Sequence, residues 1–152
     1  MKRFVALLVV FLTLLYWFPI SASAANSNVS YIYYEDGSTL EISVIKPSAS
    51  TRSSGTKTGQ KAYKLIESNG STAWIATLYG TFSYDGTICT CIETHCDITI
   101  YNNAYSVVNK TVTMGVSTTS AKFTMIRKLL GITISQKDYS IVLMCDKDGN
   151  FS

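Results

Sequence analysis

Residues 89–97, Cys-Thr-Cys-Ile-Glu-Thr-His-Cys-Asp, contain the densest set of reactive side chains in the sequence. Three of the four cysteines and the single histidine fall within this segment. Cys89, Cys91, His95 and Cys96 are ligand types that suit tetrahedral zinc, but structural zinc sites usually show paired ligand spacings that are repeated at a distance. The sequence has no such repeat, so we expect no metal site and no other cofactor.

The same segment also contains an acid–base pair. If it is extended, Glu93, His95 and Asp97 share one face, and a carboxylate beside an imidazole can orient it as a general base. A hydrolase also needs a nucleophile and an oxyanion site, and no serine or threonine stands in a recognisable nucleophile motif. We therefore expect no catalytic residue and a protein that is not an enzyme.

The first 24 residues have the three parts of a secretory signal peptide. Lys2 and Arg3 precede an apolar run over residues 4–20, and the small residues 22–24 follow. We expect cleavage after Ala24 and a secreted, extracellular protein with no membrane attachment after cleavage. An uncleaved anchor is the alternative, because the apolar run approaches the minimum length of a membrane span, about 17 residues.

Export bears on the four cysteines, because thiols tend to pair in an oxidising compartment. Four cysteines allow three pairings, and the sequence excludes none of them. A bridge between Cys91 and Cys145 closes a loop of about 54 residues and stabilises the fold by about 4 kcal/mol in the entropic model. With Cys89 and Cys96 as a local clip, this is the pairing that we expect.

The elements that must position this segment are strands. Runs of β-branched and aromatic residues are separated by turn residues such as Asn69-Gly70 and Asp85-Gly86. Short strands at regular intervals, without a convincing amphipathic helix, predict an all-β antiparallel β-sandwich, immunoglobulin-like or related, with about eight strands. The residues expected in its core are Trp74, Leu78, Phe82, Val112, Met114, Phe123, Ile134, Ile141 and Leu143.

The mature chain is expected to have three parts. Residues 25–45 alternate around a turn and predict an N-terminal β-hairpin. Residues 46–60 are small and polar without apolar periodicity, which predicts a flexible linker and a loosely attached hairpin. Residues 61–152 form the sandwich core, with an additional turn at residues 93–96 and a strand–turn–strand arrangement from Met125 onward.

The charge balance excludes one class of partner. Two of the 13 Lys and Arg residues lie in the leader, which leaves 11 against 10 Asp and Glu. A nearly neutral mature chain lacks the surplus of basic residues that nucleic-acid binding requires.

Tyrosines provide the candidate binding surface. Their rings are flat and amphipathic, and thus suited to contact with a glycan or a protein, although tyrosine is also an ordinary residue of packed strands. The candidates lie in the first hairpin and around Asn102-Asn103, and they are Tyr31, Tyr33, Tyr34, Tyr101 and Tyr105.

Several turn and strand motifs resemble those of small exported, uncharacterised β-rich proteins of Gram-positive, clostridia-like bacteria. The motifs are EDGS at residues 35–38, KTGQKAY at 57–63, NG at 69–70 followed by Trp74, GTFSYDG at 80–86 followed by Cys91, and LGI at 130–132 leading to VLMC at 142–145. The resemblance implies export, a shared β-fold and a Cys91–Cys145 pair. No activity and no catalytic residue carry over from it.

These observations favour a secreted, disulfide-stabilised protein that binds an extracellular glycan, the cell wall or a protein without catalysis. The second hypothesis is an exported antagonistic, toxin-like or bacteriocin-like effector that is released by processing within residues 46–60. The third is a hydrolase or metal protein that uses residues 89–97.

Overall fold

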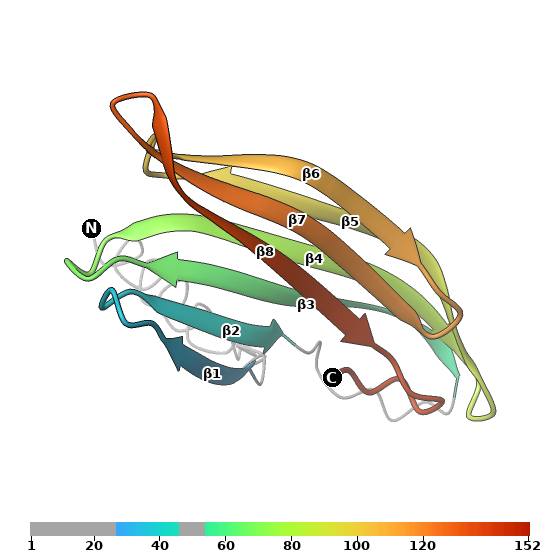
Figure 1. Ribbon diagram of the computed structural model, residues 1–152. Coiled ribbons are helices and arrows are strands. Elements are labelled where there is room, and N and C mark those ends of the chain that lie inside the picture. The colour runs from blue at the N-terminus through green and yellow to red at the C-terminus, as the bar shows by residue number, and fades with distance from the viewer. Residues whose placement is uncertain (1–26, 46–53) are drawn as a thin grey trace, which may run out of the picture.

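The computed structural model describes residues 27–45 and 54–152, which form eight strands and no helix (Figure 1). The expected leader and the expected cleavage site lie outside the described residues. Within the described ranges there is no helix that is long and apolar enough to cross a membrane. The strands are β1 (Ser27–Tyr33), β2 (Thr39–Ile45), β3 (Gly55–Ile66), β4 (Thr72–Tyr84), β5 (Cys89–Ile100), β6 (Tyr105–Met114), β7 (Thr118–Leu129) and β8 (Ile132–Met144).

The expected all-β antiparallel architecture is confirmed. One sheet has the order β1-β2-β3-β4-β5 and the other has the order β6-β7-β8, and every pair is antiparallel. Within each sheet, neighbouring strands are also neighbours in sequence, which is a meander and not the Greek key of immunoglobulin domains. Figure 1 shows the second sheet lying across the first, with β8 and β7 over β3 and β4.

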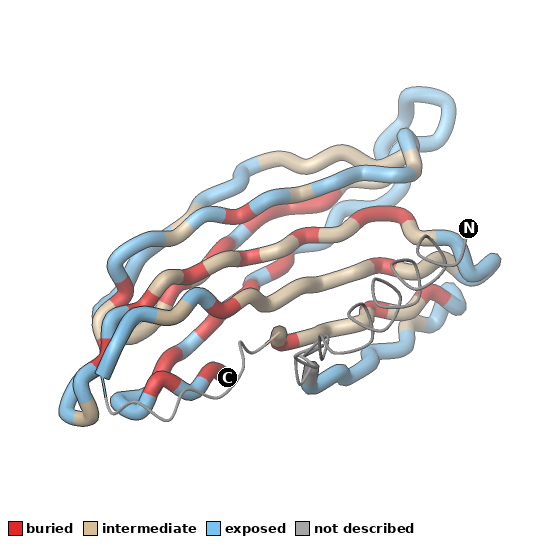
Figure 2. The backbone as a smooth tube through the Cα atoms, turned by 180° about the vertical axis from the view of Figure 1, so that it is seen from behind, coloured by how far each residue is buried: buried red, intermediate tan, exposed pale blue. Residues whose placement is uncertain are grey.

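The core lies between the sheets, because buried and more exposed side chains alternate along β4 from Trp74 to Tyr84. Trp74, Leu78 and Phe82 on its inner face have no exposed surface, and Ile141 and Leu143 of β8 are equally buried opposite them. The alternating pattern in the sequence thus identified the buried face, since successive side chains of a strand point to opposite sides. Figure 2 shows the resulting alternation of buried and exposed positions along the strands.

Three of the nine expected core residues differ from the prediction. Val112 is only partly buried, while Met114 and Ile134 are 53% and 52% exposed. Met114 is the last residue of the edge strand β6, and Ile134 lies on a hairpin that extends beyond the first sheet (Figure 1). Both follow the apolar period, but no facing strand covers them.

The boundaries of the expected linker are wrong on its C-terminal side. Residues 55–60 are the beginning of β3, and they pair with β4 along its far half. Residues 46–53 lie outside the described residues. The N-terminal hairpin is also joined more closely than expected, because β2 pairs with β3 from Thr39 to Ile45 and thereby completes the five-stranded sheet.

The expected turn at residues 93–96 is wrong, since β5 continues through it to Ile100. A bulge in the pairing of β4 with β5, at Thr81 and Phe82, accommodates the segment without breaking the strand. The strand–turn–strand arrangement after Met125 is confirmed by β7 and β8.

The two ends of the sandwich differ in construction. The closed end carries the β4–β5 and β6–β7 turns and the C-terminal segment, residues 145–152, at the lower right of Figure 1. Phe151 is 2% exposed there, and its ring packs edge-on against Phe82 at 5.6 Å between centroids. The open end carries the β1–β2, β3–β4, β5–β6 and β7–β8 turns.

Candidate functional site

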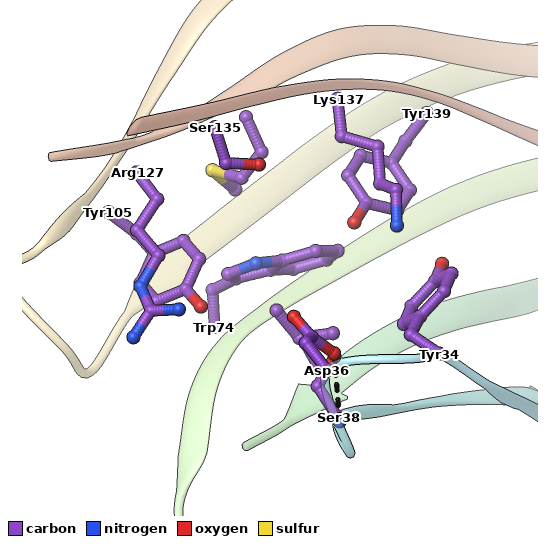
Figure 3. Close-up of a pocket in the computed structure, with 11 residues that line it drawn as sticks. Tyr34, Asp36, Ser38, Trp74, Tyr105, Arg127, Ser135, Lys137 and Tyr139 are labelled. Carbon is purple, nitrogen blue, oxygen red and sulfur yellow. Dashed lines mark hydrogen bonds between the residues drawn. The ribbon is translucent and has the colours of Figure 1, made fainter. Parts of the chain in front are cut away.

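A cavity of about 60 Å³ lies between the sheets at the open end (Figure 3). We call it the open-end pocket. It combines aromatic rings, hydroxyl groups and charged groups from both sheets. Its lining residues are Tyr34, Asp36, Ser38, Leu65, Trp74, Tyr105, Met125, Arg127, Ser135, Lys137 and Tyr139.

Trp74 occupies the centre of the pocket. The side chain is fully buried, and its Nε1 has no hydrogen-bond partner. The ring is held by edge contacts with Phe123 and Tyr139, at 5.9 Å and 4.9 Å between centroids. Most buried polar groups in proteins are hydrogen-bonded, and leaving one unpaired costs about 1–3 kcal/mol. This N–H is therefore a donor held in place without an acceptor.

Lys137 and Tyr34 form one wall of the pocket. The Lys137 ammonium nitrogen lies 3.3 Å from the centroid of the Tyr34 ring. This is a cation–π contact, which stabilises by about 0.5–1 kcal/mol at an exposed site. The Lys137 side chain stands on the exposed outer part of β8, so its ammonium group lies at the entrance.

Arg127 and Tyr105 form the opposite wall. The Arg127 guanidinium carbon lies 5.5 Å from the Tyr105 ring centroid, and its Nη2 lies 3.7 Å from Oε1 of Glu67. Glu67 is held in turn by Nδ2 of Asn102, which donates to Oε2 at 2.9 Å. The Arg127 charge is thus balanced by the Glu67 carboxylate.

Asp36 sits at the turn between β1 and β2 and faces the pocket. Its Oδ1 accepts hydrogen bonds from the Ser38 backbone N–H, at 3.0 Å, and from the Ser38 hydroxyl group. These bonds lower the pKa of Asp36, because they stabilise the charged form. The pocket therefore contains a carboxylate, and Lys137 lies on the other side of its entrance.

The hydroxyl groups of Tyr139 and Tyr105 in the pocket remain protonated. Burial is the main cause that raises the pKa of Tyr139 far above its ordinary value, and the neighbouring Tyr34 adds to it through charge and a hydrogen bond. Burial likewise raises the pKa of Tyr105. Each hydroxyl group can therefore donate as well as accept a hydrogen bond.

A second, wider hollow of about 420 Å³ adjoins the pocket on its outer side. Tyr33 and Glu35 line only this hollow, whereas Tyr34, Asp36 and Lys137 line both. The two spaces are thus adjacent and share three lining residues. A ligand can thus place one small group beside Trp74 while the rest of it lies outside.

The predicted tyrosine surface is divided by the fold. Tyr34 and Tyr105 meet in the open-end pocket, and Tyr33 lines the outer hollow. Tyr31 stacks on Tyr33 at 6.5 Å on the exposed side of β1, while Tyr101 is 62% exposed in the β5–β6 turn.

Sequence reasoning missed the remaining pocket residues. Trp74 was assigned to the core, where it indeed lies, and nothing in the alternation shows that its N–H lacks a partner. Lys137 and Tyr139 follow each other at period two on β8, so both face the same side. This spacing of a cation and an aromatic residue was the one signal in the sequence that could have indicated that both side chains line the same pocket.

The four cysteines are all buried free thiols in the structure, so neither expected disulfide is formed. Cys89, and not Cys91, lies beside Cys145, although the two sulfurs are not at bonding distance. Cys91 instead donates from Sγ to the carbonyl of Glu93 at 3.5 Å. Burial raises the pKa of Cys91, Cys96 and Cys145, which opposes the thiolate form.

The candidate zinc ligands are not brought together. Cys96 is 3% exposed and faces the core, whereas the adjacent His95 lies on the outer face with 55% of its side chain exposed. No group of three or more potential ligands converges among the residues that the structure describes.

The candidate acid–base residues do share one face, as expected. His95 Nε2 lies 3.9 Å from Oδ2 of Asp97, and Glu93 is exposed on the same side of β5. The imidazole stacks flat on Tyr79, at 4.4 Å between centroids. None of the hollows described above is lined by these residues.

Comparison with known proteins gives no match. No family model matches the sequence, and neither a curated protein nor a solved structure is similar to it. The resemblance to exported clostridia-like proteins thus stays a prediction, and the geometry of the open-end pocket carries the functional argument.

Proposed function

We propose that this protein is a secreted, non-catalytic binding protein that holds a hydroxyl-rich ligand, such as the end of a glycan chain, in the open-end pocket. One observation carries the proposal. Trp74 presents a buried N–H without a partner at the centre of a pocket that is otherwise lined by polar groups. A ligand that supplies an acceptor removes the cost of this unpaired donor.

The other groups favour hydroxyl groups as ligand atoms. The Asp36 carboxylate accepts, the Lys137 ammonium group donates, and the tyrosine hydroxyl groups do both. A sugar hydroxyl group also donates and accepts, so it matches each of these partners. Aromatic residues, with a few polar groups that fix orientation, are typical of ligand pockets.

The size of the two spaces indicates how such a ligand is held. The inner cavity of about 60 Å³ has room for about two water-sized groups, given about 30 Å³ for each. A single hydroxyl or hydroxymethyl group therefore enters beside Trp74. The outer hollow of about 420 Å³ then holds the remainder of the sugar and leaves the chain free to continue into solvent.

Tryptophan fluorescence tests the proposal directly. Trp74 is the only tryptophan of the described residues, so its emission reports on the pocket. The exported protein is titrated with soluble peptidoglycan fragments, N-acetylglucosamine oligomers and glucose oligomers. We expect saturable changes in emission with one of these probes, and matching heats in isothermal titration calorimetry.

Variants of two lysines provide the matched comparison. Lys137→Ala removes a pocket cation and is expected to weaken binding about tenfold, the loss of one charge-assisted hydrogen bond. Lys147→Ala removes an exposed lysine that pairs with Asp148 at the closed end, and it should leave binding unchanged. Absence of binding to all three sugars, or equal binding by both variants, would overturn the proposal.

The effector hypothesis has less support from the described residues. A cut within residues 46–53 would leave β2 paired with β3 over seven residues, so the hairpin would stay attached. A cut within residues 55–60 would fall inside β3, between β2 and β4. Release of a processed fragment therefore requires disruption of the five-stranded sheet.

A further inference from the structure

The turn between β7 and β8 carries exposed apolar side chains that the fold does not use. We call residues 128–134 the tip hairpin; it projects beyond the first sheet at the upper left of Figure 1. Leu130 is 95% exposed, and three neighbours are also more than half exposed. These neighbours are Leu129, Ile132 and Ile134.

The conformation of Leu130 is a second, independent observation. Leu130 and Gly131 have φ values of 49° and 83°, so both central residues of this two-residue turn are in the left-handed region. Such turns favour Asn-Gly, because a leucine at positive φ is strained. Leu130 therefore contributes neither favourable backbone geometry nor buried surface to the fold.

From this combination we infer that the tip hairpin inserts into the interface of a lipid bilayer. The four apolar side chains can leave water there without a shaped partner surface. A stable protein partner is a poorer fit, because protein interfaces commonly involve about 20–30 residues on each side. This inference is an alternative to the prediction of a mature chain without membrane contact.

The surroundings of the tip suit the headgroup region. Residues 127–137 contain Arg127, Lys128 and Lys137 but no Asp or Glu. Arg127 is paired with Glu67 and Lys137 lies on Tyr34, which leaves the exposed Lys128 at the base of the tip to meet lipid phosphates. The charge of Lys128 is thus complementary to an anionic leaflet.

The β5–β6 turn reinforces this arrangement. The Lys128 backbone N–H donates to the carbonyl of Ala104 at 2.8 Å, which holds that turn against the base of the tip. The same turn carries the exposed Tyr101. Tyrosine is enriched at membrane interfaces, where its ring meets the acyl chains and its hydroxyl group meets water.

Flotation with lipid vesicles tests the inference. The exported protein is mixed with vesicles of phosphatidylcholine alone and of phosphatidylcholine with phosphatidylglycerol. We expect binding to both, with stronger binding to the anionic vesicles. The double variant L130N/I132T should bind about a hundredfold less, because burial of each of the two apolar side chains accounts for about a tenfold gain in binding.

Three variants separate this surface from the rest of the molecule. Lys128→Gln should lose about fivefold on anionic vesicles only, the effect of one basic residue near such a surface. Val116→Thr alters an apolar residue that is 76% exposed at the closed end, and it should bind as the unchanged protein does. Trp74→Phe alters the pocket and should also leave vesicle binding intact, which distinguishes a failure here from a failure of the proposed function.

The double variant must fold for this comparison to hold. L130N relieves a left-handed leucine, so its melting temperature should be equal to or above that of the unchanged protein. No flotation of the unchanged protein, or equal flotation of L130N/I132T, would overturn the inference. So would concentration-dependent self-association that the double variant abolishes, because the tip would then contact a second copy of the chain.

Discussion

The closed and open ends of the sandwich are built from the same strands but are packed differently. At the closed end, Phe151 fills the space over Gly59, where a Cβ atom would lie 2.7 Å from the Phe151 ring. At the open end, a cavity remains, and a buried indole N–H has no partner. The comparison teaches that close packing and the unpaired buried N–H lie at opposite ends of the strands, so we expect substitutions at the closed end to affect stability more than the proposed binding.

The largest loss of stability is expected from a substitution at the closed end. Phe151→Ala removes a nearly fully buried ring that packs on Phe82, and it should lower the free energy of unfolding by about 4 kcal/mol. Chemical denaturation measures this loss. Tyr101→Ala, at an exposed site near the open end, is the control and should change stability by less than about 0.5 kcal/mol. Equal losses in both variants would contradict the distinction between the ends.

The next effect concerns the thiols of the closed end. Refolding with a small-molecule disulfide should link Cys89 to Cys145, because these two sulfurs are neighbours. In this exchange the two protein thiols are oxidised, and the small disulfide is reduced to two thiols. Non-reducing peptide mapping identifies the pair. Reduction of the link should lower the free energy of unfolding by about 4 kcal/mol in the entropic model.

Cys96→Ser is the control for this link, because Cys96 lies elsewhere on β5, beside the Lys110 side chain, and should not affect the map. A peptide that joins Cys91 to Cys145 would refute the assignment and support the pairing expected from the sequence.

A smaller effect is expected for Trp74→Phe at the open end. The substitution removes the unpaired N–H but keeps an aromatic ring, so the lost packing and the relieved desolvation should leave a net destabilisation below about 1 kcal/mol. Binding of the sugar found in the fluorescence screen, followed by calorimetry, should weaken about tenfold. A stability loss as large as that of Phe151→Ala, with unchanged binding, would assign Trp74 to the core alone.

The smallest expected effect is a pH dependence of the stability that the β1–β2 turn contributes. Because hydrogen bonds from Ser38 lower the pKa of Asp36 in the folded state, their contribution is present above the unfolded pKa of about 3.9 and is lost as pH falls below it. Asp36 is exposed, so the contribution is at most about 0.5 kcal/mol.

Ser38→Ala should remove this acid-dependent component, which unfolding at pH 7 and pH 3 measures. An identical pH dependence in Ser38→Ala and the unchanged protein would rule out this role of the turn.

The sequence predicted those parts of the fold that depend on local alternation. Trp74, Leu78 and Phe82 were placed in the core correctly, because a one-sided strand must bury every second residue. Ile134 follows the same period, yet its exposure depends on how far the facing sheet extends, which no local pattern encodes. The additional turn at residues 93–96 failed for a related reason, since the long partner β4 keeps β5 extended.

The candidate site was predicted only in part. Tyr34 and Tyr105 were identified from their residue type, but they are 71 positions apart and meet only because both sheets contribute to the open end. The pairing of Cys91 with Cys145 was expected instead of the observed proximity of Cys89. The choice between two thiols two residues apart depends on the packing of the C-terminal segment, which is a long-range property.

The meander has a consequence for how the molecule forms. Every sheet contact joins strands that are neighbours along the chain, so each hairpin can form before distant residues are available. During synthesis, β1 to β5 are complete before any residue of the second sheet has emerged. The inner face of β4, with Trp74 and Phe82, must then wait for β7, β8 and Phe151 to cover it. The assembly order thus leaves the hydrophobic face exposed until late, when the closed end completes the core.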